Sequence, residues 1–255
     1  MRWVGSAALL PLLVLAACSS TAAPTQTAAT PAVSRIRQSV ARTESAGTAH
    51  LVQTSVDRTT IGATATHPES TTSVVAVGDV RFAGPDASLT ITSRSALATG
   101  TPSTSTSQTV YIGDHVYAHV PPQPTWSEAG RSSVSFPYLG AVPTRTLETT
   151  TGPVTDDGSR TVDGQPTTEY SVPVPRSVRA DRLTDSENRP YTVRFTTAPF
   201  TLSVWLDHTG RVVRTSGSFV VTSQSTGSVQ ETTTATLSAF GQPVRIVAPT
   251  VASGG

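Results

Sequence analysis

Residues 200–221, FTLSVWLDHTGRVVRTSGSFVV, have the most regular alternation in the chain. Large apolar residues recur at every second position over 200–206, which is typical of a strand whose side chains point to two faces in turn. Asp207–Gly210 then supplies turn residues, and residues 211–222 return with the same period. The stretch therefore predicts an antiparallel hairpin with one apolar face, made of Phe200, Leu202, Val204, Leu206, Val213, Phe219 and Val221.

Similar patterns extend in both directions from this hairpin. Gly113-Asp114 and Asp163-Gly164 each separate two short alternating runs, and Gly tolerates the positive φ of a two-residue hairpin turn. Residues 102–108 are rich in Thr and Ser and are interpreted as a loop. Further strands are predicted at 51–57, 71–82, 88–95 and 229–238. The total is roughly eight to eleven antiparallel strands.

One helix is predicted clearly, over residues 33–46. Val33, Ile36 and Val40 recur at helical spacing, and Gly47 is a suitable residue to end the helix. Residues 178–187 have weaker helical spacing and suggest a second helix. The fold class is therefore mainly β with one or two helices (α+β), built on a single antiparallel sheet.

The N-terminus carries an export pattern. Arg2 precedes an apolar run over residues 3–15, which is too short to span a bilayer and fits a signal peptide. The run ends in Leu15-Ala16-Ala17-Cys18, which resembles the bacterial lipobox. We expect cleavage between Ala17 and Cys18, and lipidation of the Cys18 thiol. The alternative is an ordinary secretory peptide with an incidental cysteine.

This interpretation divides the chain into four parts. Residues 1–17 are the lipoprotein signal peptide, and 18–32 are the lipidated cysteine with a flexible tether of Ser, Thr, Ala and Pro. Residues 33–250 form the folded domain, and 251–255 are a disordered tail. The expected location is the extracytoplasmic face of the cell membrane, where two acyl chains anchor a protein stably.

Composition excludes several classes of function. The net charge is +1 and charged residues are 14% of the chain, so no basic footprint for nucleic acid is present. Cys18 is the only cysteine, which excludes internal disulfides and cysteine metal sites. His115 and His119 share a strand face without a third metal ligand nearby in sequence, and no catalytic constellation is recognisable. We expect a protein that is not an enzyme and has no metal or cofactor.

Several of these motifs together resemble the actinobacterial LppX/LprA/LprF/LprG lipoproteins, which share a fold with the lipoprotein carriers LolA and LolB. The similar stretches, in order, are residues 110–117 with Trp126, 162–170, 204–207 with 210–214, and 240–244. The resemblance implies a half-open β-barrel, in which one strongly bent antiparallel sheet wraps helices around an apolar cavity. It also implies binding or carriage of an acylated lipid or lipoglycan, without catalytic residues.

Low aromatic content, 5%, also fits a sheet whose inner face is left partly hollow, although a tightly packed sandwich is equally compatible with it. The alternative function is a non-catalytic sensor, regulator or structural lipoprotein of the cell envelope that acts through protein–protein contacts. The cavity wall is predicted to contain nine residues, which could instead be packed core: Ile36, Val40, Phe200, Leu202, Val204, Leu206, Val213, Phe219 and Val221.

Overall fold

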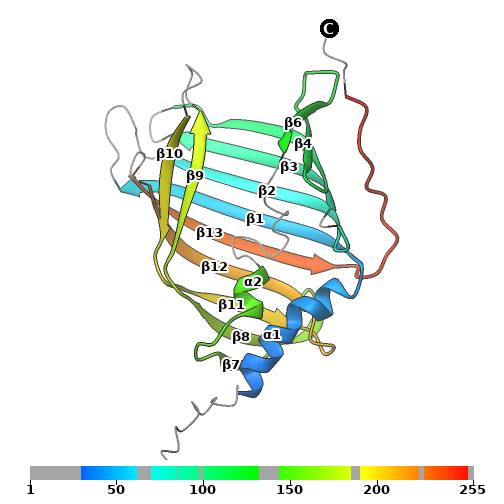
Figure 1. Ribbon diagram of the computed structural model, residues 1–255, viewed down its shortest axis with the longest axis vertical. Coiled ribbons are helices and arrows are strands. Elements are labelled where there is room, and N and C mark those ends of the chain that lie inside the picture. The colour runs from blue at the N-terminus through cyan, green and yellow to red at the C-terminus, as the bar shows by residue number, and fades with distance from the viewer. Residues whose placement is uncertain are drawn as a thin grey trace, which may run out of the picture.

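The computed structural model describes residues 30–61, 70–84, 86–97, 100–131, 144–184, 190–223 and 227–251. Within these residues, thirteen strands form one curved antiparallel sheet, and two helices lie over one of its faces (Figure 1). The helices are α1 (Pro31–Glu44) and α2 (Thr144–Glu148). The strands are β1 (Thr48–Ile61), β2 (Ser70–Arg81), β3 (Asp86–Leu97), β4 (Ser103–Ile112), β5 (His115–His119), β6 (Ser127–Arg131), β7 (Thr155–Val162), β8 (Gln165–Val174), β9 (Ser177–Thr184), β10 (Pro190–Thr197), β11 (Phe200–Leu206), β12 (Val212–Ser223) and β13 (Gly227–Ser238).

The sheet is open and does not close on itself. Its main path runs β6-β5-β4-β3-β2-β1-β13-β12-β11-β8-β7, so that β6 and β7 are the two edges. The β9–β10 hairpin leaves this path, because β10 pairs with the end of β12 and β9 pairs with β10. A mainly β fold with one open antiparallel sheet and two helices confirms the predicted fold class.

Helix α1 begins and ends as local sequence rules require. Thr30 caps it by accepting a hydrogen bond from the Val33 N–H at 3.4 Å, and Pro31 follows at the first position, where no N–H is needed. Gly47 lies just beyond the end with φ of +79°, a conformation that favours glycine. The helix covers two residues more at its start, and two fewer at its end, than the predicted 33–46.

The described strands differ from the predicted ones at two places. Residues 103–108 are the first part of β4 and not a loop, since Ser103–Tyr111 pairs continuously with Ser95–Ala87 of β3. Residues 177–184 are strand β9 and not part of a helix, since each of them pairs with a residue of β10. The strand count therefore exceeds the predicted eight to eleven. In both cases backbone pairing across the sheet overrides the local sequence signal.

The core lies between the two helices and the inner face of the sheet, which we define as the face that carries Leu51, Leu202 and Val204. Val33, Ile36 and Val40, the residues that recur at helical spacing, are all buried. The core cluster joins α1 and α2 to strands from both halves of the sheet. Burying each large aliphatic side chain contributes ~1.5–3 kcal/mol, so this contact holds α1 on the sheet.

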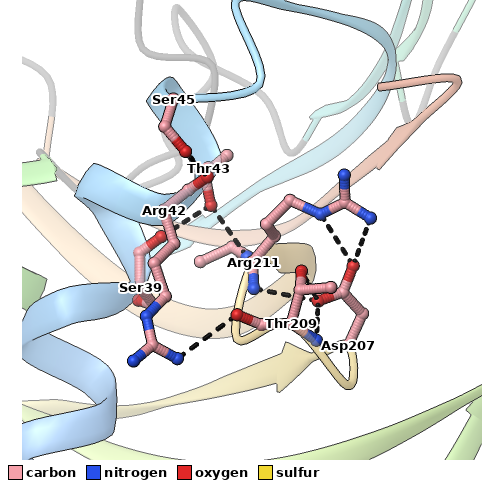
Figure 2. A network of polar contacts seen from close by, with 8 residues as sticks. Ser39, Arg42, Thr43, Ser45, Asp207, Thr209 and Arg211 are labelled. Atoms are coloured by element: carbon pink, nitrogen blue, oxygen red, sulfur yellow. Dashed lines mark hydrogen bonds and ion pairs between the residues drawn. The ribbon is translucent and has the colours of Figure 1, made fainter. Parts of the chain in front are cut away.

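The turn between β11 and β12 docks the C-terminal end of α1 (Figure 2). The Thr43 hydroxyl accepts a hydrogen bond from the Val212 N–H at 2.8 Å and donates to the Ser39 carbonyl at 2.7 Å. The Arg42 guanidinium donates to the Thr209 carbonyl at 3.2 Å. These contacts fix the direction in which α1 crosses the sheet.

In the part of the chain that the structure describes, neither helix combines the length and the apolar character that crossing a membrane requires.

Candidate functional site

A cleft of ≈ 670 Å³ opens where α2 and the segment after it meet the hairpin formed by β8 and β11. One wall is the segment from Thr149 to Pro153, and the other wall comes from both strands of the hairpin. The two walls approach closely, because a Cβ added at Gly152 would lie 2.9 Å from Cγ of Pro173. The lining residues are Thr146, Thr149, Thr150, Thr151, Gly152, Pro153, Pro173, Val174, Pro175, Pro199, Phe200 and Thr201.

The cleft lies at a break in one long hairpin. On one side of the break Val174 pairs with Phe200, and on the other side Ser177 pairs with Thr197. The register is the same on both sides, so β8 continues into β9 and β10 continues into β11. Pro175 and Pro199 lie within the break, and neither can donate a hydrogen bond to the ladder. The β9–β10 arm therefore leaves the path of the sheet here, as Figure 1 shows.

Phe200 connects the cleft to the core. Its ring packs on Phe219 with centroids 4.8 Å apart and planes tilted by 32°. Gly217 makes this arrangement possible, since an added Cβ would lie 3.1 Å from Cε2 of Phe200 and 3.3 Å from Cδ1 of Leu202. The apolar floor of the cleft is therefore supported by residues of β11 and β12.

Helix α1 supports the opposite wall. The Arg37 Nε donates a hydrogen bond to the Thr150 carbonyl at 2.7 Å, which holds the segment after α2 against the helix. Two residues earlier, the Arg35 guanidinium donates to the hydroxyl of Tyr170 at 2.9 Å. Tyr170 is fully buried, so this bond satisfies a hydroxyl that would otherwise be costly to bury.

The described lining of the cleft carries no ionisable side chain. The lining combines the apolar side chains of Phe200, Val174 and four prolines with the hydroxyls of several threonines. Such a surface makes apolar contacts and hydrogen bonds to uncharged groups. An isolated anion would gain no charged partner from this lining and would lose hydration on entry.

The nine residues predicted for a cavity wall lie in different settings. Phe200 lines the cleft, and Phe219 packs beneath it. Val213 is buried and Val221 is partly exposed. The remaining five are packed in the core cluster with at most 3% exposure: Ile36, Val40, Leu202, Val204 and Leu206. Their contact with a ligand stays a prediction.

Sequence reasoning missed the residues that shape the cleft. Thr149–Pro153 belongs to no regular element, and neither Pro175 nor Pro199 was singled out. A usable signal was present, because these two prolines lie at nearly matched positions of a single hairpin, where each interrupts its strand. Ala17 and Cys18 lie outside the described residues.

Three histidines in the described part of the chain, His50, His115 and His119, make ion-pair or ring contacts. His115 approaches Glu128 at 2.9 Å and Asp114 at 3.2 Å, whereas His119 packs on Trp126. Residues 30–61 and the other described ranges contain no group of three or more His, Cys, Asp or Glu side chains arranged to hold a metal ion.

No protein-family model and no curated protein sequence matches the chain significantly. Solved structures similar to it include the Mycobacterium tuberculosis lipoprotein LppX, at 18% identity and a TM-score of 0.48, covering 85% of this chain and 98% of that one. LprF from Mycobacterium bovis is 14% identical with a TM-score of 0.45, covering 86% and 96%. A β-barrel-like protein of a domain of unknown function from Brucella abortus is 9% identical with a TM-score of 0.27, covering 74% and 97%. LppX and LprF are both named in the resemblance that the sequence motifs suggested.

Proposed function

We propose that this protein is a membrane-anchored extracytoplasmic lipoprotein that binds an acylated lipid in the cleft beside α2. The observation that carries the proposal is the ≈ 670 Å³ cleft whose described lining combines Phe200, Val174 and prolines with threonine hydroxyls and carries no charge. Ligand pockets of proteins usually measure ~300–1,000 Å³ and combine apolar walls with a few polar groups. The cleft therefore has the size and the surface for acyl chains with an ester or hydroxyl head.

The anchoring part of the proposal rests on the N-terminal sequence. Leu15-Ala16-Ala17-Cys18 provides the residues for signal cleavage and for diacylglyceryl transfer to the thiol. Two acyl chains on Cys18 would hold the domain at the extracytoplasmic face of the membrane. The cleft would then bind, carry or present a lipid or lipoglycan close to that surface.

Native mass spectrometry of the full-length protein, released from membranes in detergent, tests this function. A non-covalent adduct of lipid mass, in addition to the constant covalent mass on Cys18, is the expected result. Thr151→Trp should lower the adduct population at least several-fold, because Thr151 is an exposed lining residue and the indole would fill the cleft.

Thr161→Trp is the matched control, since Thr161 is an exposed residue of β7 outside the cleft lining. Equal loss of lipid in both variants would contradict binding at the cleft. A parent protein without any lipid adduct would contradict the binding function and favour a sensor, regulatory or structural role through protein contacts.

A further inference from the structure

The structure brings the beginning of α1 close to the cleft. From this we propose that the cleft end of the domain faces the bilayer that holds Cys18, with the lipid surface as its partner. The proposal rests on the anchoring part of the proposed function. It adds an orientation, in which the cleft end and not the β6 edge of the sheet lies next to the membrane.

The contacts of α1 place its first turns beside the cleft. Arg37 donates to the carbonyl of Thr150, which is a lining residue. Pro31 lies six residues before Arg37, which corresponds to ~9 Å along the helix axis. The chain that leads toward Cys18 therefore joins the domain a short distance from the cleft wall.

The direction of α1 is fixed at its other end. The hydroxyl of Thr43 accepts a hydrogen bond from the Val212 N–H, and the Arg42 guanidinium donates one to the Thr209 carbonyl. The last turn of the helix is therefore attached to the β11–β12 turn. Ile36 and Val40, in the middle of the helix, are fully buried. Since Arg35, Arg37 and the last turn of α1 are all bonded to the rest of the domain, the point where the tether leaves the domain is fixed relative to the cleft.

The tether between Cys18 and the domain is short compared with the width of the sheet. Cys18 and Thr30 are 12 residues apart in sequence. A chain of this length spans at most ~40 Å when fully extended. The β6 edge, by contrast, is ten strand spacings from the β7 edge along the main path, which amounts to ~50 Å around the curved sheet. The anchor therefore keeps the cleft end nearer to the bilayer than the β6 edge.

This orientation determines where a bound lipid comes from. A mouth that faces the bilayer can receive an acyl chain without moving it through a long path of bulk water. Transfer of apolar surface into water costs ~25 cal/mol per Å², so a short path favours exchange with the adjacent leaflet.

Depth-dependent quenching of a single fluorophore tests the orientation. Cys18 is the only native cysteine and is consumed by acylation, so an introduced cysteine gives a unique label. Thr155→Cys places the label on the exposed first residue of β7 near the cleft, and Ser127→Cys places it on an exposed residue of β6. Acylated full-length variants, each labelled with bimane, are reconstituted in phosphatidylcholine–phosphatidylglycerol vesicles with or without doxyl-labelled lipid.

We expect quenching at position 155 to be at least twofold stronger than at position 127. The orientation would be overturned by equal quenching, by stronger quenching at position 127, or by no quenching at either position. It would also be overturned if the mass of the intact protein showed no acyl groups on Cys18. Lipid occupancy of the same samples is measured by native mass spectrometry. Lipid-loaded protein with equal quenching refutes the orientation alone, whereas unequal quenching in protein without lipid supports the orientation and refutes the lipid-binding function.

Discussion

The carboxylate of Asp207 and the guanidinium of Arg211 form a two-point ion pair across the β11–β12 turn. Oδ2 of Asp207 lies 2.8 Å from Nε and 2.7 Å from the Nη2 nitrogen of Arg211. The other carboxylate oxygen accepts hydrogen bonds from the Thr209 N–H, the Thr209 hydroxyl and the Arg211 N–H. The turn that docks α1 is thus organised around one buried carboxylate (Figure 2).

Asp207 should make folding stability sensitive to acid. Burial on its own would raise the pKa of this carboxyl, but hydrogen bonds from Thr209 and Arg211, together with the Arg211 charge, lower the pKa below its usual 3.8. A lowered folded-state pKa gives stability that is present above about pH 4 and is lost as the pH falls through the folded value. Asp207→Asn should therefore flatten the pH dependence of the unfolding free energy below pH 5.

Urea unfolding at several pH values between 2 and 7 measures this effect. Asp163→Asn is the control, because Asp163 is an exposed turn residue between β7 and β8. Parallel pH profiles for Asp207→Asn and the parent would show that this carboxylate has the same pKa in the folded and unfolded chain.

Thr43→Val should destabilise the protein by ~1–3 kcal/mol with little change in shape. The substitution leaves the buried Val212 N–H without the acceptor that it has in the parent at 2.8 Å. Ser45→Ala removes an exposed hydroxyl that donates to the Arg42 carbonyl of the same helix, and should cost less than 1 kcal/mol. Urea unfolding at pH 7 compares the two variants, and equal losses would argue against a docking role for Thr43.

Gly217→Ala should alter both stability and the cleft. The new methyl group would crowd the Phe200 ring and the Leu202 side chain, and overpacking of this kind costs ~1–3 kcal/mol. The displaced Phe200 ring should also change lipid occupancy measured by native mass spectrometry. Gly100→Ala is the control, because its Cβ would meet only Leu97 at ordinary contact distances of 3.7–3.8 Å. Unchanged stability and occupancy in Gly217→Ala would contradict this description of the cleft floor.

Cys18→Ala should release the protein from the membrane into the soluble or secreted fraction. The substitution removes the thiol to which the acyl groups would be attached. Fractionation and detergent partitioning of the two proteins provide the measurement, and Ser19→Ala serves as a neighbouring control. A Cys18→Ala protein that still sediments with membranes would refute the anchoring proposal.

The sequence was most informative where side-chain periodicity and turn chemistry agree. β11 was predicted with its observed bounds, because apolar residues alternate throughout Phe200–Leu206 and a turn follows directly. The turns at Gly113 and at Asp163-Gly164 were predicted for the same reason, and both positions have positive φ in the structure.

Prediction failed where a strand lacks an apolar face. Residues 103–108 contain Ser, Thr and Gln, so no pattern separates them from a loop, and only pairing with β3 makes them a strand. The cleft was missed for a related reason. The cleft arises from a break between paired strands and from a loop packed against that break, and neither feature gives a periodic pattern. Regular alternation instead pointed to Leu202, Val204 and Leu206, which are packed in the core.

The unchanged register across the break at Pro175 and Pro199 has a consequence for how this protein can diverge. Because β9 and β10 are the outer part of the hairpin that begins as β8 and β11, removing or adding one residue on each strand beyond the break changes the length of the arm and leaves the inner pairs unaltered. An unpaired insertion before the break, however, would shift every inner pair by one position and exchange the two faces of β8 or β11. Paired length changes in the arm are therefore a route by which related chains can vary the surroundings of the cleft while keeping the same core.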